Sequence, residues 1–270
     1  MAERRAAIST AELEAQVAQA DPPRNFFAAV TRHSPTEPTA VIAEIKRKSP
    51  SAGWIRDEYR PADDRILGDG DSFEPERIAR RYHAAGAAAI SCLTDGAFFG
   101  GDLSYIERVR DAVPLPVLRK DFIVDAWQLW ESRAAGADAV LLIGECLTEA
   151  QIVDMMILSQ RLGMTVLLEV HSTENLLRVR PHVGFPHPSY CLLGINNRDL
   201  STMTVDIAQT TRLADLVENR SILVAESGIR TGKDLAKLRQ SDVRIALVGE
   251  TLMRAPDPGV ALADLLRPTV

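Results

Sequence analysis

The chain has 270 residues and a formal net charge of −6, with 46% hydrophobic and 25% charged residues. Its length allows a large buried core, and its acidic balance excludes nonspecific nucleic-acid binding, which needs a clustered basic excess. No apolar run reaches membrane length, and the histidines and cysteines have no spacing typical of a metal site. We therefore expect a protein of the reduced cytoplasmic compartment, without a metal, a membrane or a nucleic-acid partner, in which Cys92, Cys146 and Cys191 are small core residues.

Residues 1–40 are expected to form an N-terminal helical extension. A capping-box pattern at residues 9–12 starts one helix, which the prolines after Asp21 end, and residues 25–30 suggest a second short helix. We expect these helices to cover an opening of the part that follows, residues 41–270, within a single domain overall.

From residue 41 onward, short apolar runs alternate with longer segments of helical spacing. The eight strand candidates are residues 41–46, 88–93, 116–120, 139–143, 165–169, 190–196, 222–226 and 245–248. The helix candidates are residues 74–85, 103–112, 126–135, 148–161, 172–180, 206–218, 232–239 and 258–266. This alternation predicts an α/β fold, a (β/α)8 TIM barrel. Two connections are long: the acidic segment 54–73 after the first strand, and residues 181–189, which precede the sixth strand and so belong to the opposite rim.

The odd-numbered strands end in ionisable side chains. The first carries Glu44 and Lys46, the third ends in Lys120, the fifth in Glu169 and the seventh in Glu226. Alternate strands of this fold supply one interior layer, and chemistry takes place at their carboxyl ends. A single Glu–Lys pair would equally well be a structural ion pair, but charges on four alternate strands predict a functional site.

Polar groups also follow other strands at this rim. Lys48 continues the alternation of the first strand into a loop, and Asn196 and Arg198 follow the sixth strand. An amide can hold a hydroxyl and a guanidinium a planar carboxylate. The alternative for the latter two is an Asn-rich turn with a salt bridge to Asp199.

The turns after the seventh and eighth strands predict an anion site. Ser227 and Gly228 stand in the first turn, and Gly249 and Glu250 in the second. Glycine in such turns leaves backbone N–H groups free, and phosphate frequently binds between these loops. Glu250 fits there only if its carboxylate points away. Apolar residues at the same rim suit an aromatic ring or ordinary core packing: Phe99, Phe122, Leu141, Ile143 and Leu200.

Five motifs give the chain a resemblance to a known family. They are EIKRKSPS (residues 44–51), LRKDFI (118–123), LEV (168–170), GINNRDL (194–200) and AESGI (225–229). With them the chain resembles indole-3-glycerol phosphate synthase over residues 25–268. The resemblance implies a carboxy-lyase of tryptophan biosynthesis that converts 1-(2-carboxyphenylamino)-1-deoxyribulose 5-phosphate, by general acid–base catalysis, to indole-3-glycerol phosphate, CO2 and water. It implies no cofactor, and a small phosphorylated molecule as the partner of a monomer or weak homo-oligomer.

The resemblance also implies roles for the rim residues. Lys120 would protonate the ketone oxygen, Lys46 would orient the substrate carboxylate, Glu44 would hold the lysines, Glu169 would be the base, and Lys48 or Lys120 the acid in the loss of water. Sugar hydroxyls and the anthranilate carboxylate would be bound by Asn196 and Arg198, and Glu226 would bind a hydroxyl or position Lys120. Phosphate would be held by Ser49, Ser227, Gly228 and Gly249.

One departure and two alternatives accompany this interpretation. Segment 54–73 is longer than the family usually has, and its acidic residues are expected to affect loop closure near an anionic ligand. Another phosphate-binding barrel, such as a phosphoribosyl isomerase or an aldolase forming a Schiff base at Lys120, is one alternative. A noncatalytic barrel is the other, although it would be expected to lack some of Glu44, Lys46, Lys120 and Glu169.

Overall fold

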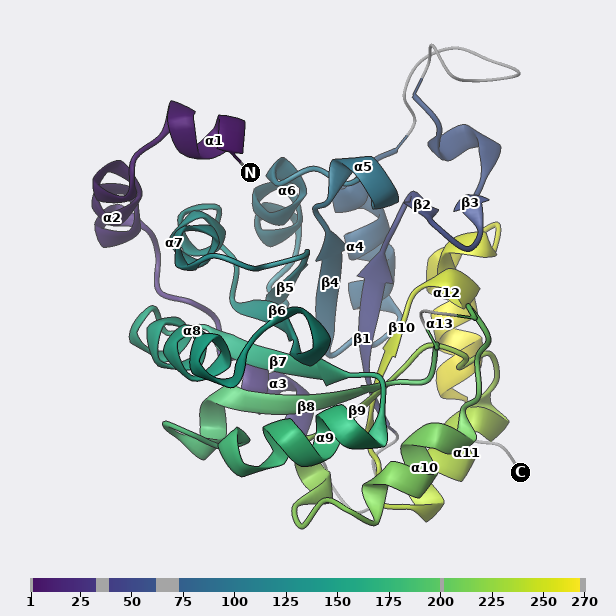
Figure 1. Ribbon diagram of the computed structural model, residues 1–270. Helices are drawn as coiled ribbons and strands as arrows, with labels where there is room; N and C mark the ends of the chain where they lie inside the picture. The colour runs from purple at the N-terminus through teal and green to yellow at the C-terminus, as the bar shows by residue number, and fades with distance from the viewer. Residues whose placement is uncertain (1, 33–38, 62–72, 200–201, 268–270) are drawn as a thin grey trace.

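Eight parallel strands close into a barrel in the computed structural model, which describes residues 2–32, 39–61, 73–199 and 202–267. The strands neighbour one another in the order β1-β10-β9-β8-β7-β6-β5-β4, so the predicted TIM barrel is confirmed (Figure 1). Each predicted strand is present within one residue at either end. The strands are β1 (Ala40–Ile45), β4 (Ala89–Leu93), β5 (Val117–Lys120), β6 (Ala139–Ile143), β7 (Thr165–Val170), β8 (Cys191–Asn196), β9 (Leu223–Glu226) and β10 (Ile245–Val248).

Helices surround the barrel and return the chain to its amino end. They are α4 (Pro75–Ala84), α6 (Ser104–Ala112), α7 (Ala126–Ala134), α8 (Glu149–Arg161), α9 (Thr173–Val179), α10 (Ala208–Ala214), α11 (Gly232–Gln240) and α13 (Pro258–Leu266). The helix predicted at residues 206–218 is shorter at both ends: Asp206 accepts from the N–H of Ala208 in a turn before it, and after Ala214 the N–H of Leu216 donates to the carbonyl of Leu213 in another turn. The short helices α5 (Gly96–Phe99) and α12 (Glu250–Arg254) were not predicted. None of the helices in the described ranges is long and apolar enough to cross a membrane.

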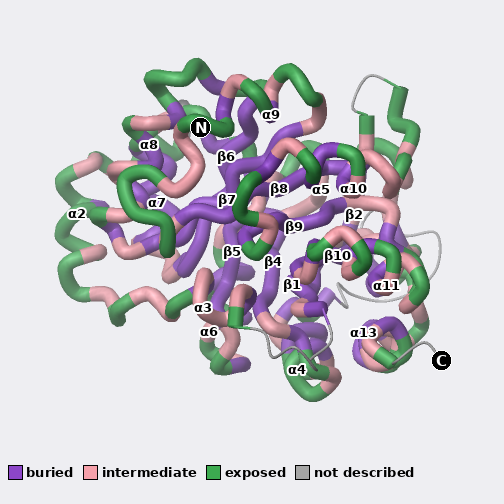
Figure 2. Tube along the Cα trace, turned by 90° about the horizontal axis from the view of Figure 1, so that it is seen from below, coloured by how far each residue is buried: buried purple, intermediate pink, exposed green. Residues whose placement is uncertain are grey.

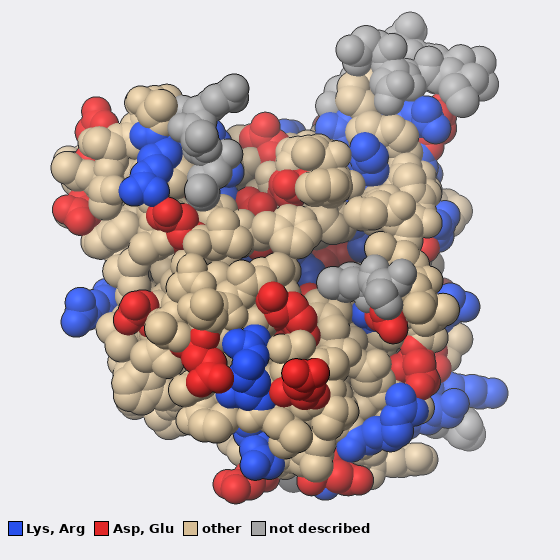
Figure 3. Space-filling model, viewed as in Figure 1, with Lys and Arg blue, Asp and Glu red and all other residues tan. Residues whose placement is uncertain are grey.

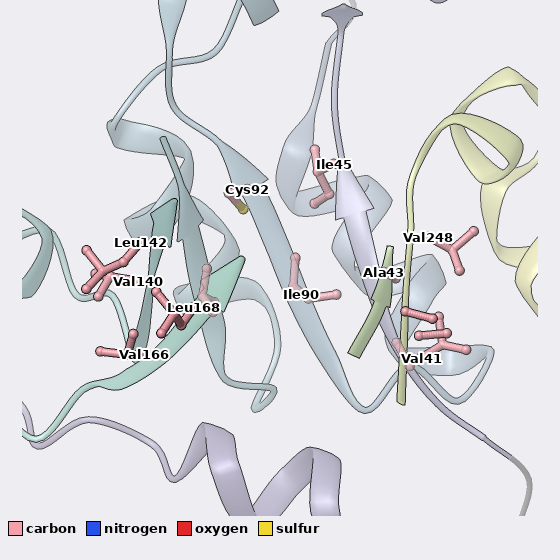
Figure 4. Packing of buried hydrophobic residues seen from close by; sticks show 14 of the residues in the cluster. Val41, Ala43, Ile45, Ile90, Cys92, Val140, Leu142, Val166, Leu168 and Val248 are labelled. Carbon is pink, nitrogen blue, oxygen red and sulfur yellow. The ribbon is translucent and has the colours of Figure 1, made fainter. Parts of the chain in front are cut away.

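Strand alternation divides the core into two layers. Val41, Ala43 and Ile45 of β1 belong to the cluster between the strands and the surrounding helices (Figure 4). Ile42 points the other way, into the apolar interior of the barrel with Leu118 and other residues of the inner cluster. The strands are buried while the exposed positions lie on the helices and loops (Figure 2). A polar residue at an inward position near a strand's end therefore lies on top of an apolar plug.

The N-terminal helices contact the barrel at two places. Phe26 and Val30 of α3 (Phe26–Thr31) are fully buried in the inner cluster. This helix therefore closes the amino end of the barrel. The preceding helix α2 (Thr10–Gln19) packs on α7, and α1 (Ala2–Ala7) reaches the same helix through Arg5, whose guanidinium lies 2.7 Å from Asp125.

The described parts of the two long connections lie at different rims, and residues 62–72 of the acidic segment lie outside the described residues. Residues 48–54 form a small hairpin of β2 (Lys48–Ser49) and β3 (Gly53–Trp54) beyond β1, which was not predicted. Segment 181–189 contains parts of two 3-10 turns, one of which contacts α3 at the amino rim. Among the cysteines, the core role predicted for Cys146 is wrong: it is exposed, because it lies in a 3-10 turn (Gly144–Cys146) that follows β6.

Candidate active site

A buried lysine between two carboxylates lies at the carboxyl end of the barrel. The Nζ atom of Lys120 is 3.0 Å from Oε2 of Glu169 and 2.8 Å from Oε2 of Glu226. The three side chains come from β5, β7 and β9, at the inward positions next above the apolar plug. Figure 3 shows a hollow in the middle of this face with charged atoms of both signs inside it.

The three groups shift one another's pKa values. Burial disfavours the charged lysine, but the charges of Glu169 and Glu226 overcome this and hold the pKa of Lys120 well above its ordinary value. Burial would raise the pKa of Glu169, yet Lys120 and the nearby His171 bring it well below its ordinary value. Burial and the charge of Glu169 raise the pKa of Glu226 to about 8. The lysine is therefore held in its charged form, and of the two carboxylates Glu226 is the one that binds a proton more readily.

A second ion pair lies beside this cluster on β1. The Nζ atom of Lys46 is 2.6 Å from Oε1 of Glu44, and both side chains are largely buried. The charge of Glu44 also acts on Lys120. The predicted ring of charges thus consists of two lysine–carboxylate groups, and the charge of one group acts on the lysine of the other.

Two glycines provide the space for the carboxylates. A Cβ atom at Gly249 would overlap Oε1 of Glu44, and a Cβ atom at Gly194 would overlap Oε1 of Glu226. The φ angle of Gly249 is −128°, which any residue can adopt, so the missing side chain is what this position requires. In addition to any role at the phosphate, Gly249 therefore makes room for a charged side chain.

Asn196 links the lysine cluster to the loops. Its Nδ2 donates to Oε1 of Glu169 at 3.2 Å, and its Oδ1 accepts from Oγ of Ser227 at 2.8 Å and from the N–H of Arg198 at 3.1 Å. The guanidinium of Arg198 lies 3.5 Å from Oε2 of Glu250. The asparagine thus orients the proposed base from one side.

The turns after β9 and β10 are tied together. Ser227 and Gly228 have φ angles of 65° and 81°, a left-handed backbone that is unusual for serine. The hydroxyl of Thr251 donates to the carbonyl of Ile229 at 2.8 Å, which joins the two turns. The carboxylate of Glu250 lies 3.0 Å from Nε of Arg254. Glu250, the acidic residue beside the predicted anion site, is therefore in contact with Arg254 and Arg198.

Other predicted residues lie towards the edge of the site. The Nζ atom of Lys48 is 3.5 Å from the carbonyl of Ala97 in α5 and 5.4 Å from the centre of the Trp54 ring, and no ion pair joins it to a carboxylate in the described ranges. Ser49 is buried in the hairpin, where its Oγ accepts from the N–H of Ala52 at 3.2 Å. The structure therefore does not bring these two residues into the lysine–carboxylate cluster.

Two of the apolar candidates face each other at the rim. The rings of Phe99 and Phe122 are 6.3 Å apart between centroids, and Phe122 is 40% exposed. Leu141 and Ile143 are buried inside the barrel, whereas Leu200 lies outside the described residues. Phe122 is thus the apolar candidate with the largest exposed fraction among those described, whereas Leu141 and Ile143 are core residues.

His171 and Glu145 also lie at this site, and neither was expected there from the sequence. The Nε2 atom of His171 lies 3.2 Å from Oε1 of Glu169, and its Nδ1 atom lies 3.2 Å from Oε2 of Glu145. A signal was present, because His171 stands two residues after Glu169 and so on the same side of an extended chain. No group of His, Cys, Asp and Glu within the described ranges is arranged to hold a metal ion.

The barrel and its buried lysine–carboxylate cluster define a TIM-barrel enzyme equipped for acid–base chemistry. The family model for indole-3-glycerol phosphate synthase matches residues 1–265. Curated relatives of that name are 43% identical: the Rhodospirillum rubrum protein over 98% of this chain and 94% of its own length, and the Rhodopirellula baltica protein over 97% and 92%. The chain therefore belongs to the indole-3-glycerol phosphate synthase family.

Solved structures show how widely this fold is shared. The 3-hexulose-6-phosphate synthase of Salmonella typhimurium has a TM-score of 0.60 at 12% identity, over 84% of this chain and 98% of that one. A mutant tryptophan synthase α-subunit of Pyrococcus furiosus has a TM-score of 0.60 at 10% identity, over 85% and 98%. At such identities the similarity concerns the fold alone.

Proposed function

We propose that the Lys120 cluster carries out the reaction of this family, the decarboxylating ring closure of 1-(2-carboxyphenylamino)-1-deoxyribulose 5-phosphate. The products are indole-3-glycerol phosphate, CO2 and water. Family membership supports the reaction, and the observation that supports the assignment is the position of Lys120 between Glu169 and Glu226. A lysine kept charged by two carboxylates is an acid that stays loaded at neutral pH.

The first step forms a carbon–carbon bond. The ring carbon that bears the carboxylate attacks the ketone carbon, and the ketone oxygen takes a proton from Lys120 and becomes a hydroxyl. Loss of CO2 returns its bonding pair to the ring. Lys46, fixed by its 2.6 Å contact with Glu44, orients the carboxylate until it leaves.

The second step removes water from the new ring. The hydroxyl leaves with a proton from Lys48, or from Lys120 after solvent has returned the proton that it gave in the first step, and the ionised Glu169 takes a proton from the ring. Asn196 holds Glu169 in place, because its amide donates to that carboxylate. Balanced in this way, the reaction needs only proton transfers and positioning.

The remaining candidates bind the substrate in this proposal. Arg198 and Asn196 contact the anthranilate carboxylate and sugar hydroxyls, Glu226 positions Lys120 or contacts a hydroxyl, and Phe99 and Phe122 contact the aromatic ring. The turns after β9 and β10 hold the phosphate with Ser49, Ser227, Gly228, Gly249 and the main chain of Glu250. The support is their common location at the carboxyl end of the barrel.

Lys120→Met tests the assignment, with the exposed Lys237→Met as matched control. Product is followed by the absorbance of the indole ring. We expect the wild type and the control to turn over, and Lys120→Met to lose on the order of 10²–10⁴-fold in kcat while it still binds a substrate analogue. Near-normal turnover of Lys120→Met would remove this lysine as the acid, and a wild type that forms no indole product would refute the reaction.

An aldolase using Lys120 is disfavoured by the same geometry. Schiff-base formation needs a neutral amine, whereas the neighbouring carboxylates hold the pKa of Lys120 well above its ordinary value. Borohydride should therefore trap no adduct on Lys120 with a ketose phosphate.

We also propose that the protein acts in the cytoplasm as a monomer or weak homo-oligomer. The support is a small phosphorylated substrate and a site built from residues of one chain. Light scattering at micromolar concentration tests the oligomeric state, and a stable oligomer would contradict it.

A further inference from the structure

A histidine and a second glutamate lie behind the proposed base. His171 follows β7 and Glu145 follows β6, and the two side chains meet with Nδ1 of the histidine 3.2 Å from Oε2 of the glutamate. The other ring nitrogen, Nε2, lies 3.2 Å from Oε1 of Glu169. The imidazole therefore bridges two carboxylates, one of which belongs to the Lys120 cluster.

The position of His171 is fixed by its main chain as well as its ring. Its N–H donates to Oε1 of Glu145 at 2.8 Å, and its carbonyl accepts from Nε2 of Gln209 at 2.7 Å. The same Gln209 nitrogen also donates to the carbonyl of Asn196 at 3.2 Å. The histidine is thus held in register with the asparagine that orients Glu169 from its other side.

The surroundings of His171 favour its charged form. Burial opposes the charge, but the hydrogen bond to Glu145, the 3.2 Å contact with Glu169 and the charges of both carboxylates raise the pKa of His171 to about 10. On the solvent side, Arg212 of α10 lines a cavity of about 350 Å³ with His171 and is paired with Asp206 at 2.8 Å. Burial and the charges of Glu145 and Glu169 raise the pKa of Cys146, which leaves its thiol neutral.

The charged ring of His171 lies beside Glu169, whereas Lys120 contacts both Glu169 and Glu226. Lys120 contacts Glu169 and Glu226 at nearly equal distances, 3.0 and 2.8 Å. The histidine and the amide of Asn196 contact Glu169. The free oxygen of Glu226, Oε1, is buried and has no hydrogen-bond partner in the described ranges. These contacts favour the charged form of Glu169, so a proton shared by the pair is favoured on Glu226.

We propose that His171, held by Glu145, is a positioning residue that keeps Glu169 ionised as the base of the water-loss step and leaves the shared proton on Glu226. This inference rests on the proposed function. It assigns His171 no contact with the reacting atoms.

The kinetic test compares the pH dependence of kcat in the wild type and His171→Gln, with the exposed His83→Gln as matched control. Without the adjacent cation the pKa of Glu169 rises, so we expect the acidic limb of kcat to move to higher pH by about one unit or more. KM should change little and the plateau above that limb should be retained. Glu145→Gln should move the limb in the same direction by less. An acidic limb that stays in place, or a kcat reduced equally at every pH, would indicate a merely structural histidine and overturn the proposal.

A second measurement needs no substrate. In ¹⁵N-labelled protein, the imidazole signals that disappear in His171→Gln belong to His171, and we expect them to report both nitrogens protonated at about pH 8. A neutral His171 at that pH would overturn the inference even in an active enzyme. If the wild type formed no indole product, the proposed function would fail while this titration still decided the charge of His171.

Discussion

The raised pKa of Glu226 makes the stability of the fold depend on pH in a direction that can be measured. Burial and Glu169 raise that pKa to about 8, whereas a glutamate in an unfolded chain has a pKa of about 4.3. Between these values the native state binds a proton that the unfolded state has lost. The free energy of unfolding therefore falls as pH rises, by at most about 1.4 kcal/mol per pH unit from this one proton.

Glu226→Gln removes this proton while keeping the shape of the side chain. Over the two units from about pH 5.5 to 7.5, we expect the wild type to lose up to about 2.7 kcal/mol more than the variant. Because the proton is shared within the Lys120 cluster, about half of this difference would still support the argument. Urea unfolding followed by circular dichroism measures it at each pH, and Glu107→Gln, on an exposed part of α6, is the matched control.

A raised pKa of Glu226 is refuted if the free energies of unfolding of wild type and Glu226→Gln run parallel when plotted against pH. If the free energies of unfolding of wild type and Glu226→Gln change equally with pH over this window, Glu226 is ionised in the native state. The division of roles between Glu169 and Glu226 would then have no electrostatic basis.

Two further substitutions test other parts of the structure. Gly249→Ala should lower both turnover and stability, the latter by about 1–3 kcal/mol, because the new Cβ overlaps the carboxylate of Glu44. The control is Gly96→Ala, whose Cβ would meet its nearest neighbour at 3.5 Å. Equal effects of the two substitutions on thermal unfolding and kcat would contradict this reason. Asp138→Ala should lower the free energy of unfolding by about 3–5 kcal/mol and leave KM unchanged, because it removes the ion-pair partner of Arg110 and the acceptor of the Val117 N–H. A changed KM with an unchanged free energy of unfolding would argue against a purely structural aspartate.

The strands and the charge cluster could be predicted from sequence because both follow from alternation. Short apolar runs give the strands, and every second residue at a strand's end faces the interior, so Lys120, Glu169 and Glu226 were expected to converge. His171 obeys the same rule. It was missed because the predicted strand ended at Glu169, whereas the extended chain continues to Val170.

Pairing within the cluster could not be predicted, because it depends on spacings between strands that no local pattern contains. Lys46 pairs with Glu44 of its own strand, while Lys120 takes both remaining carboxylates. The space at Gly249 also escaped prediction, since glycine before a helix suggested backbone freedom or an anion site. Only the position of Glu44 shows that a side chain is excluded there.

The two excluded side chains suggest how this barrel accommodates an ionic layer. In barrels of this type, four side chains from alternate strands fill one interior layer. Here the odd strands β1 and β9 carry Glu44 and Glu226, and each carboxylate lies against a glycine on an adjacent strand, Gly249 beyond β10 and Gly194 on β8. A side chain at either glycine would compete for the volume in which a carboxylate meets its lysine. The two glycines therefore affect the electrostatics of the site, because the space they leave determines where the carboxylates lie and which lysine each one contacts.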